Sequence, residues 1–163
     1  SAISMSAFPK AVVLDRDGCL NVASSNPVSP LYYITRSEHL ILKPGVSQAI
    51  DILCAHDIPI VLATKQRCIS KGLVTREQVN DINRRLEEML GFAFDYIAVE
   101  ESAEDKTALF KRIAQMYQPS VDTHDSWVFD DSEEERRLAF GLGFTDFDGT
   151  DLYAAVTKAF EVS

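Results

Sequence analysis

Short apolar runs alternate with helix-like segments along almost the whole chain, and this alternation is what most constrains the fold. Strands are expected at residues 11–14, 58–63, 94–99, 127–129 and 144–147. Apolar residues at helical spacing, with end signals such as the Thr75/Gln78 capping-box pattern, predict helices at residues 44–57, 75–90, 105–117, 132–142 and 151–160. Repetition of this kind favours an α/β fold in three layers, with a mostly parallel five-stranded sheet and helices on both faces.

The first strand ends in a pair of acids. Asp15 and Asp17 close the apolar run, and Gly18 follows directly. Because alternate residues of a strand point the same way, both carboxylates are delivered to one spot, and the glycine lets the backbone turn sharply after them. Such a spot suits a hard cation and a phosphoryl group. An Asp-X-Asp-Gly string is also a common turn signal, so it needs support from elsewhere.

Support comes from the ends of the other predicted strands. Thr64 follows the second apolar run, Lys106 lies shortly after the third, and Asp130 and Asp131 follow the fourth. Ligand sites of parallel sheets lie beyond the carboxyl ends of the strands, so we expect these side chains to converge. Each has a simpler interpretation as well: Thr64 as a strand-end threonine, Lys106 as a solvated helix residue, and the acidic pair as a helix cap.

These segments resemble the haloacid-dehalogenase (HAD) superfamily of phosphohydrolases over roughly residues 11–156. Within it, the likeness is greatest to the D-glycero-D-manno-heptose 1,7-bisphosphate phosphatase and histidinol-phosphate phosphatase group. The matching segments are DRDGCLN at 15–21, LKPGV at 42–46 and TKQRCISKGLVT at 64–75. The resemblance implies a Rossmann-like, HAD-like fold. No long insertion separates the strands, so we expect no large cap domain.

The resemblance also implies a role for each residue. Asp15 would be the nucleophile that forms an aspartyl phosphate, and Asp17 the general acid and base. Thr64 and Lys106 would bind the transferred phosphate. The implied activity is that of a magnesium-dependent phosphomonoesterase hydrolysing a small phosphorylated metabolite, such as a sugar phosphate.

A magnesium ion is the implied cofactor. Its expected ligands are the Asp15 carboxylate, the Asp17 carbonyl oxygen and an acid after the fourth strand. Aligning the apolar run puts Asp131 at the family's metal position and Asp130 where a glycine is usual, and which of the two is the main ligand stays open. Glu135 falls where the family places a second acid, which would anchor Lys106 or a metal-bound water.

The chain departs from the group in three places, one of which is that the group's Arg-Lys pair is reduced to a single lysine, Lys106. Residues 100–105 contain neither Cys nor His where the group carries a zinc loop, so no zinc is expected. Lys65 replaces the asparagine that usually follows the motif threonine. With Arg67 and Lys71 it forms a basic cluster in an acidic chain, interpreted as binding a second phosphate or a carboxylate of the substrate. A solvated loop is the alternative.

Residues 22–43 are too long for a simple connection, and we expect a flap or small hairpin over the site, the alternative being a disordered surface loop. Residues 1–8 are expected to be a flexible lead, and 9–163 a single domain.

The charge and hydropathy of the chain exclude some classes of binding partner. The net charge of −9 without a sustained basic stretch argues against a nucleic acid, and no apolar run is long enough for a membrane span. With no signal peptide and three cysteines outside any C-x-x-C spacing, a cytoplasmic protein with reduced thiols is expected. The expected partner is a small phosphorylated substrate, and the oligomeric state stays open.

Two alternative functions remain: a polynucleotide 3′-phosphatase, and a catalytically degenerate module that binds a phosphorylated ligand.

Overall fold

The structure is a computed structural model that describes residues 8–23, 33–117 and 123–161. Among these residues it confirms the predicted α/β fold, with a sheet of five parallel strands in the order β3-β2-β1-β4-β5. The strands are β1 (Ala11–Leu14), β2 (Ile60–Lys65), β3 (Tyr96–Glu100), β4 (Ser126–Asp130) and β5 (Thr145–Asp148). The first strand in sequence therefore lies at the centre of the sheet, between β2 and β4.

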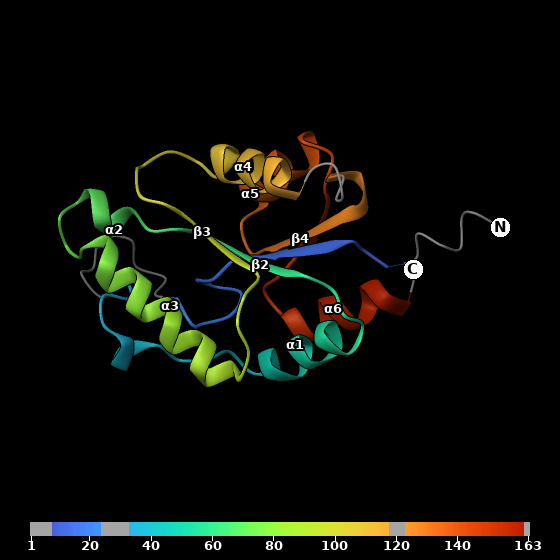
Figure 1. The fold of residues 1–163 in the computed structure, drawn as a ribbon, viewed down its shortest axis with the longest axis horizontal. Helices are drawn as coiled ribbons and strands as arrows, with labels where there is room; N and C mark the ends of the chain where they lie inside the picture. Colours follow the sequence, from blue (N-terminus) through green and yellow to red (C-terminus); the bar gives the residue numbers. More distant parts are fainter. Residues whose placement is uncertain (1–7, 24–32, 118–122, 162–163) are drawn as a thin grey trace.

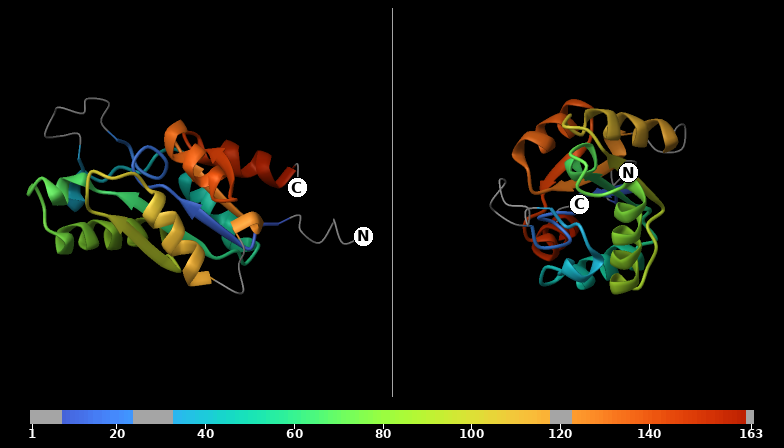
Figure 2. Two further views of the ribbon diagram at one scale, coloured as in Figure 1. Left: turned by 90° about the horizontal axis from the view of Figure 1, so that it is seen from above. Right: turned by 90° about the vertical axis from the view of Figure 1, so that its left-hand side faces the viewer.

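Helices cover both faces of this sheet (Figure 1). They are α1 (Val46–Ala55), α2 (Arg67–Ser70), α3 (Arg76–Leu90), α4 (Thr107–Tyr117), α5 (Glu133–Gly141) and α6 (Leu152–Glu161). Helices α1, α3 and α6 pack on one face, and α4 and α5 on the other, which the two views of Figure 2 also show. No helix of the described residues is both long enough and apolar enough to pass through a membrane.

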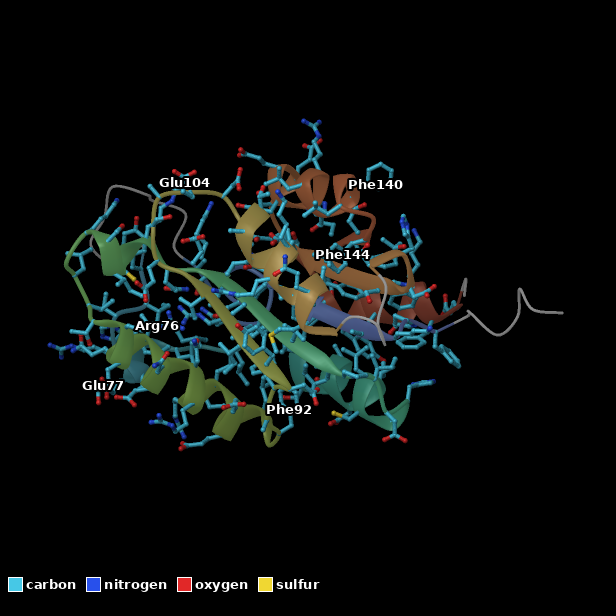
Figure 3. All side chains as sticks on the ribbon, turned by 45° about the horizontal axis from the view of Figure 1, so that its top comes forward. Arg76, Glu77, Phe92, Glu104, Phe140 and Phe144 are labelled. Carbon is cyan, nitrogen blue, oxygen red and sulfur yellow. The ribbon has the colours of Figure 1, made fainter. Side chains whose placement is uncertain are left out.

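The core divides at β1 because its side chains alternate between the faces. Val12 and Leu14 join the cluster under α1, α3 and α6, whereas Val13 joins the cluster under α4 and α5. Both faces of the strand are covered, so a continuous apolar run is stable there. On the α4–α5 side, Phe144 is buried against Phe110, while Phe140 of α5 is 70% exposed (Figure 3).

The element boundaries differ from the prediction most at β2. The strand begins at Ile60, two residues later than expected, and continues through Thr64 and Lys65, which pair with Val99 and Glu100 of β3. Thr64 is therefore part of the strand instead of following it. The short helix α2 was not predicted. The start of α3 was predicted correctly, since Thr75 caps it in a complete capping box.

The long connection after β1 is described only at its two ends, because residues 24–32 lie outside the described ranges. At its base, the Val22 amide donates to the Ile41 carbonyl at 2.8 Å, next to an antiparallel bridge between Asn21 and Leu42. This pairing agrees with the base of a hairpin, and the flap itself stays a prediction. Residues 1–7 of the expected lead also lie outside the described ranges.

Candidate active site

A pocket of about 380 Å³ lies at the carboxyl ends of the central strands. Its lining includes most of the residues singled out from the sequence: Asp15, Asp17, Lys65, Arg67, Lys106, Asp130, Asp131 and Glu135. Ala23, Tyr33 and Ser132 complete it. Thr64 and Lys71 belong to the predicted set but do not line the pocket. The fold therefore brings together side chains at or just after the carboxyl ends of β1, β2 and β4 and side chains from the segments that follow β2, β3 and β4.

The acidic centre of the pocket follows from strand register. Strands β1 and β4 pair in parallel with Leu14 opposite Phe129, so the next residues, Asp15 and Asp130, emerge side by side. Asp131 joins them, and each of the three carboxylates offers an oxygen within 4.8 Å of the others. Repulsion among three such groups has to be offset by a cation.

Lys106 supplies one positive charge to this centre. The loop that carries Glu104 leads from β3 to Lys106 (Figure 3), whose Nζ lies 2.6 Å from Asp15 Oδ1 and 2.7 Å from Asp130 Oδ2. Burial of the side chain opposes its charge, but the two carboxylates outweigh burial and raise the pKa of Lys106. The lysine is therefore held as a cation against Asp15, in contrast to the alternative of a solvated helix residue.

The surroundings of Asp15 disfavour the negative charge of its carboxylate. Burial raises its pKa well above the usual carboxyl value, and the charges of Asp130 and Asp131 add to this effect, while Lys106 opposes it. One lysine thus does not balance the acidic centre. A divalent cation, bound through carboxylate oxygens, would supply the missing charge.

Asp130 and Asp131 are not equally available as ligands for such an ion. Both oxygens of Asp130 are engaged by protein donors, Oδ2 by Lys106 and Oδ1 by the Ser132 amide at 2.9 Å. Asp131 is exposed and lies against Asp15. Gly18 makes room for it, since a Cβ at Gly18 would stand 2.1 Å from Asp131 Oδ2.

Asp17 is held by a set of side-chain donors that were not anticipated from the sequence. Arg16, fully buried, donates to Oδ1 from Nε at 3.1 Å and from Nη2 at 3.0 Å, and Asn21 donates to the same oxygen at 2.9 Å. Gln66 Nε2 donates to Oδ2, also at 2.9 Å. Burial raises the pKa of Asp17, but the charge of Arg16 and these hydrogen bonds outweigh it, so the net shift is downward.

Thr64 sits just beneath the pocket and is 1% exposed. Its hydroxyl oxygen accepts a hydrogen bond from Gln66 Nε2 at 2.7 Å. The hydroxyl hydrogen is therefore still available for another acceptor.

The three residues of the basic cluster have different surroundings. Lys65 Nζ is paired with Glu135 Oε1 at 2.9 Å. Lys71 Nζ stands over the Tyr33 ring, 5.1 Å from its centroid, outside the pocket. The Arg67 side chain is exposed at the pocket, and its guanidinium has no ion-pair or hydrogen-bond partner among residues 8–23, 33–117 and 123–161. Among the described residues, Arg67 is thus the cation of the pocket that has no anionic partner.

No protein-family model matches the chain. Among curated proteins, it is 36% identical over 81 residues to a D-glycero-D-manno-heptose-1,7-bisphosphate 7-phosphatase of Chlorobaculum tepidum, covering 50% of this chain and 38% of that protein. It is 29% identical over 120 residues to a D-glycero-beta-D-manno-heptose-1,7-bisphosphate 7-phosphatase of Bordetella bronchiseptica, covering 71% of this chain and 64% of that protein. The matches thus span less than two thirds of either relative.

A solved structure extends the likeness to three dimensions. The D,D-heptose 1,7-bisphosphate phosphatase of B. bronchiseptica, crystallised with magnesium and phosphate, is 26% identical and superposes with a TM-score of 0.73. The superposition covers 84% of this chain and 78% of that one. The sequence matches and the shared fold agree with the motifs at the ends of β1, β2 and β4. In sequence and in fold, the chain resembles the D,D-heptose 1,7-bisphosphate phosphatases of the haloacid-dehalogenase superfamily.

Proposed function

We propose that this chain is a magnesium-dependent phosphomonoesterase that hydrolyses a small phosphorylated metabolite through an aspartyl phosphate. The observation that carries the proposal is the contact of Lys106 with Asp15 inside a pocket that also holds Asp131. A carboxylate nucleophile, a fixed cation and a candidate metal ligand are the groups that phosphoryl transfer to an aspartate requires.

The residues have complementary tasks in this reaction. The Asp15 carboxylate attacks phosphorus, and the bond from phosphorus to the substrate oxygen breaks as Asp17 gives that oxygen a proton. Asp17 then takes a proton from water, whose oxygen attacks the aspartyl phosphate and releases inorganic phosphate with Asp15 restored. Lys106 offsets the negative charge of the phosphoryl group, and the free hydrogen of the Thr64 hydroxyl is donated to one of its oxygens.

Asp15, Asp131 and the carbonyl oxygen of Asp17 would hold the magnesium ion. Asp131 is the stronger candidate of the acidic pair because both oxygens of Asp130 already accept hydrogen bonds from the protein. Asp130 then serves to anchor Lys106. When bound, the ion would supply positive charge that offsets repulsion between the anionic nucleophile and the anionic substrate.

For the substrate, we propose a sugar phosphate with a second anionic group. Arg67 lines the pocket without an anionic partner among the described residues and would bind this group, while Lys65 is neutralised by Glu135. The two curated relatives are named for a heptose bisphosphate, which belongs to this class. The net charge of −9 disfavours a polynucleotide, and the convergence of the site residues disfavours a degenerate binding module.

Phosphate release from a panel of phosphomonoesters tests the proposal. The panel pairs sugar bisphosphates with the matching monophosphates, and adds histidinol phosphate, p-nitrophenyl phosphate and a 3′-phosphorylated oligonucleotide. We expect release from the sugar phosphates that requires Mg²⁺, stops with EDTA and is abolished in Asp15→Asn. Release that persists in Asp15→Asn, or no release from any compound, would contradict the proposal, and preference for the oligonucleotide would favour the polynucleotide phosphatase.

A further inference from the structure

One amide nitrogen connects two residues of the site that have different tasks. Gln66 Nε2 lies 2.9 Å from Asp17 Oδ2 and 2.7 Å from Thr64 Oγ1. A primary amide nitrogen carries two hydrogens, so these two acceptors use its whole donor capacity. The Gln66 amide must present its nitrogen, and not its oxygen, to Asp17, because a carboxylate oxygen can only accept a hydrogen bond.

Gln66 is fixed in place independently of these contacts. Its backbone amide donates to the Glu100 carbonyl at 2.8 Å and so continues the pairing of β2 with β3 by one residue. Its side chain is 1% exposed, and Oε1 accepts a weak hydrogen bond from Cys68 Sγ at 3.6 Å. A buried side chain anchored at both ends is suited to holding its partners in one geometry.

The two oxygens of Asp17 have unequal surroundings. Oδ1 receives three donor hydrogens, two from Arg16 and one from Asn21, which leaves it no capacity for another partner. Oδ2 receives only the bond from Gln66 among the described residues, and the Asp17 side chain is still 30% exposed at the pocket. Oδ2 is therefore the oxygen that faces a substrate, and Gln66 is the residue that sets its direction.

On the other side, Gln66 fixes the role of the Thr64 hydroxyl. Because the hydroxyl oxygen already accepts from Nε2, its own hydrogen is directed away from Gln66. The hydroxyl is thereby oriented as a donor.

From this geometry we propose that Gln66 is a positioning residue, which aims Asp17 Oδ2 at the oxygen of the leaving group while it orients Thr64 toward the phosphate. This rests on the proposed function, in which Asp17 protonates the leaving group. The predicted consequence is specific: loss of Gln66 should matter most when the leaving oxygen needs a proton as its bond to phosphorus breaks.

The test compares two leaving groups in Gln66→Leu. A sugar alkoxide must be protonated as it departs, whereas p-nitrophenolate leaves as a stable anion. We compare kcat/KM, which reports steps up to the cleavage of the ester bond. We expect kcat/KM for the sugar phosphate to fall at least tenfold more than kcat/KM for p-nitrophenyl phosphate. Equal losses on both substrates, or no loss on either, would overturn the proposal.

Two further variants make the result specific. Gln48→Leu, the same substitution at an exposed position of α1, should leave the ratio of the two kcat/KM values unchanged. In Asp17→Asn, adding Gln66→Leu should cause no further selective loss on the sugar phosphate, since both changes remove one function. A full additional loss in the double variant would overturn the proposal.

The design separates this inference from the function on which it rests. If the unmodified chain releases no phosphate, the proposed function fails and the inference fails with it. If the chain is active and Asp15→Asn is inactive, equal losses in Gln66→Leu overturn only the role of Gln66. If Gln66→Leu does not fold, Gln66→Asn, whose shorter amide no longer reaches both acceptors, is expected to give the same selective loss.

Discussion

Lys65 Nζ lies 2.9 Å from Glu135 Oε1, and this ion pair connects the end of β2 with the first turn of α5 inside the pocket. The Glu135 side chain is only 6% exposed, and its second oxygen accepts a hydrogen bond from the backbone amide of Lys106. Lys65 therefore neutralises a buried acid that positions the lysine of the acidic centre, which distinguishes it from Arg67.

Substitution of Lys65 and of Arg67 should have different effects. In Lys65→Met, Glu135 loses its partner, and we expect a loss of about 1–3 kcal/mol in the free energy of unfolding, measured by chemical denaturation. In Arg67→Met, the exposed side chain leaves no buried charge behind. We expect stability within about 0.5 kcal/mol of the unmodified chain and a KM for a sugar bisphosphate raised about tenfold. An unchanged KM in Arg67→Met would remove this residue from substrate binding.

Lys106→Met should abolish most of the activity and destabilise the fold. Asp15 and Asp130 lose the cation that lies between them, and the phosphoryl group loses a fixed positive charge. We expect kcat/KM to fall by a factor of about 10² or more, measured by phosphate release, and the midpoint of thermal unfolding to drop. Lys111→Met, on the exposed side of α4, is the matched control and should change neither quantity.

Magnesium binding should depend on pH in one direction. Because the pKa of Asp15 is raised, its carboxyl is partly protonated where an ordinary aspartate is ionised, and a metal ligand must be deprotonated. Affinity should therefore increase as the pH rises from the usual carboxyl range to the raised pKa of Asp15, and level off above it. Titration calorimetry in two buffers of different ionisation enthalpy measures the released proton. Proton release that is the same in Asp15→Asn would show that another group is responsible.

Gly18→Ala should weaken metal binding through steric contact. The new Cβ would stand 2.1 Å from Asp131 Oδ2, and the φ angle of +88° strains any residue with a Cβ. We expect the affinity for Mg²⁺ to fall at least about tenfold and the fold to lose about 1 kcal/mol or more. Gly91→Ala is the control, since it has a similar φ of +70° but nothing within 4 Å of the added Cβ. Its metal affinity should be unchanged, and an equal loss there would contradict the steric explanation.

The fold and the acidic centre were predictable because their signals are local. The run ending in Asp15 and Asp17 marks a buried parallel strand and its carboxyl end, and helical spacing marks the helices between strands. The exact end of β2 was not predictable, because Thr64 and Lys65 become strand residues only through pairing with β3. The length of a strand is set by pairing with the neighbouring strand as much as by propensity.

The supporting residues of the site could not be deduced in the same way. Arg16 is a residue type that is almost always exposed, yet here it is fully buried between Asp17 and Asn83. The position of Arg16 between Asp15 and Asp17 was the feature of the sequence that could have indicated its role in the site. For Gln66 the signal was its place directly after β2, and the partner of Lys65 lies 70 positions further along the chain. Only the folded structure brings such partners together.

The central place of β1 has a consequence for how the molecule is made. During synthesis from the amino terminus, β2 is available early, but the other edge of β1 stays open until Ser126–Asp130 has emerged from the ribosome. An apolar strand with an open edge invites association with other chains. Nascent chains halted before β4 should therefore be the species that chaperones retain and that aggregates in their absence.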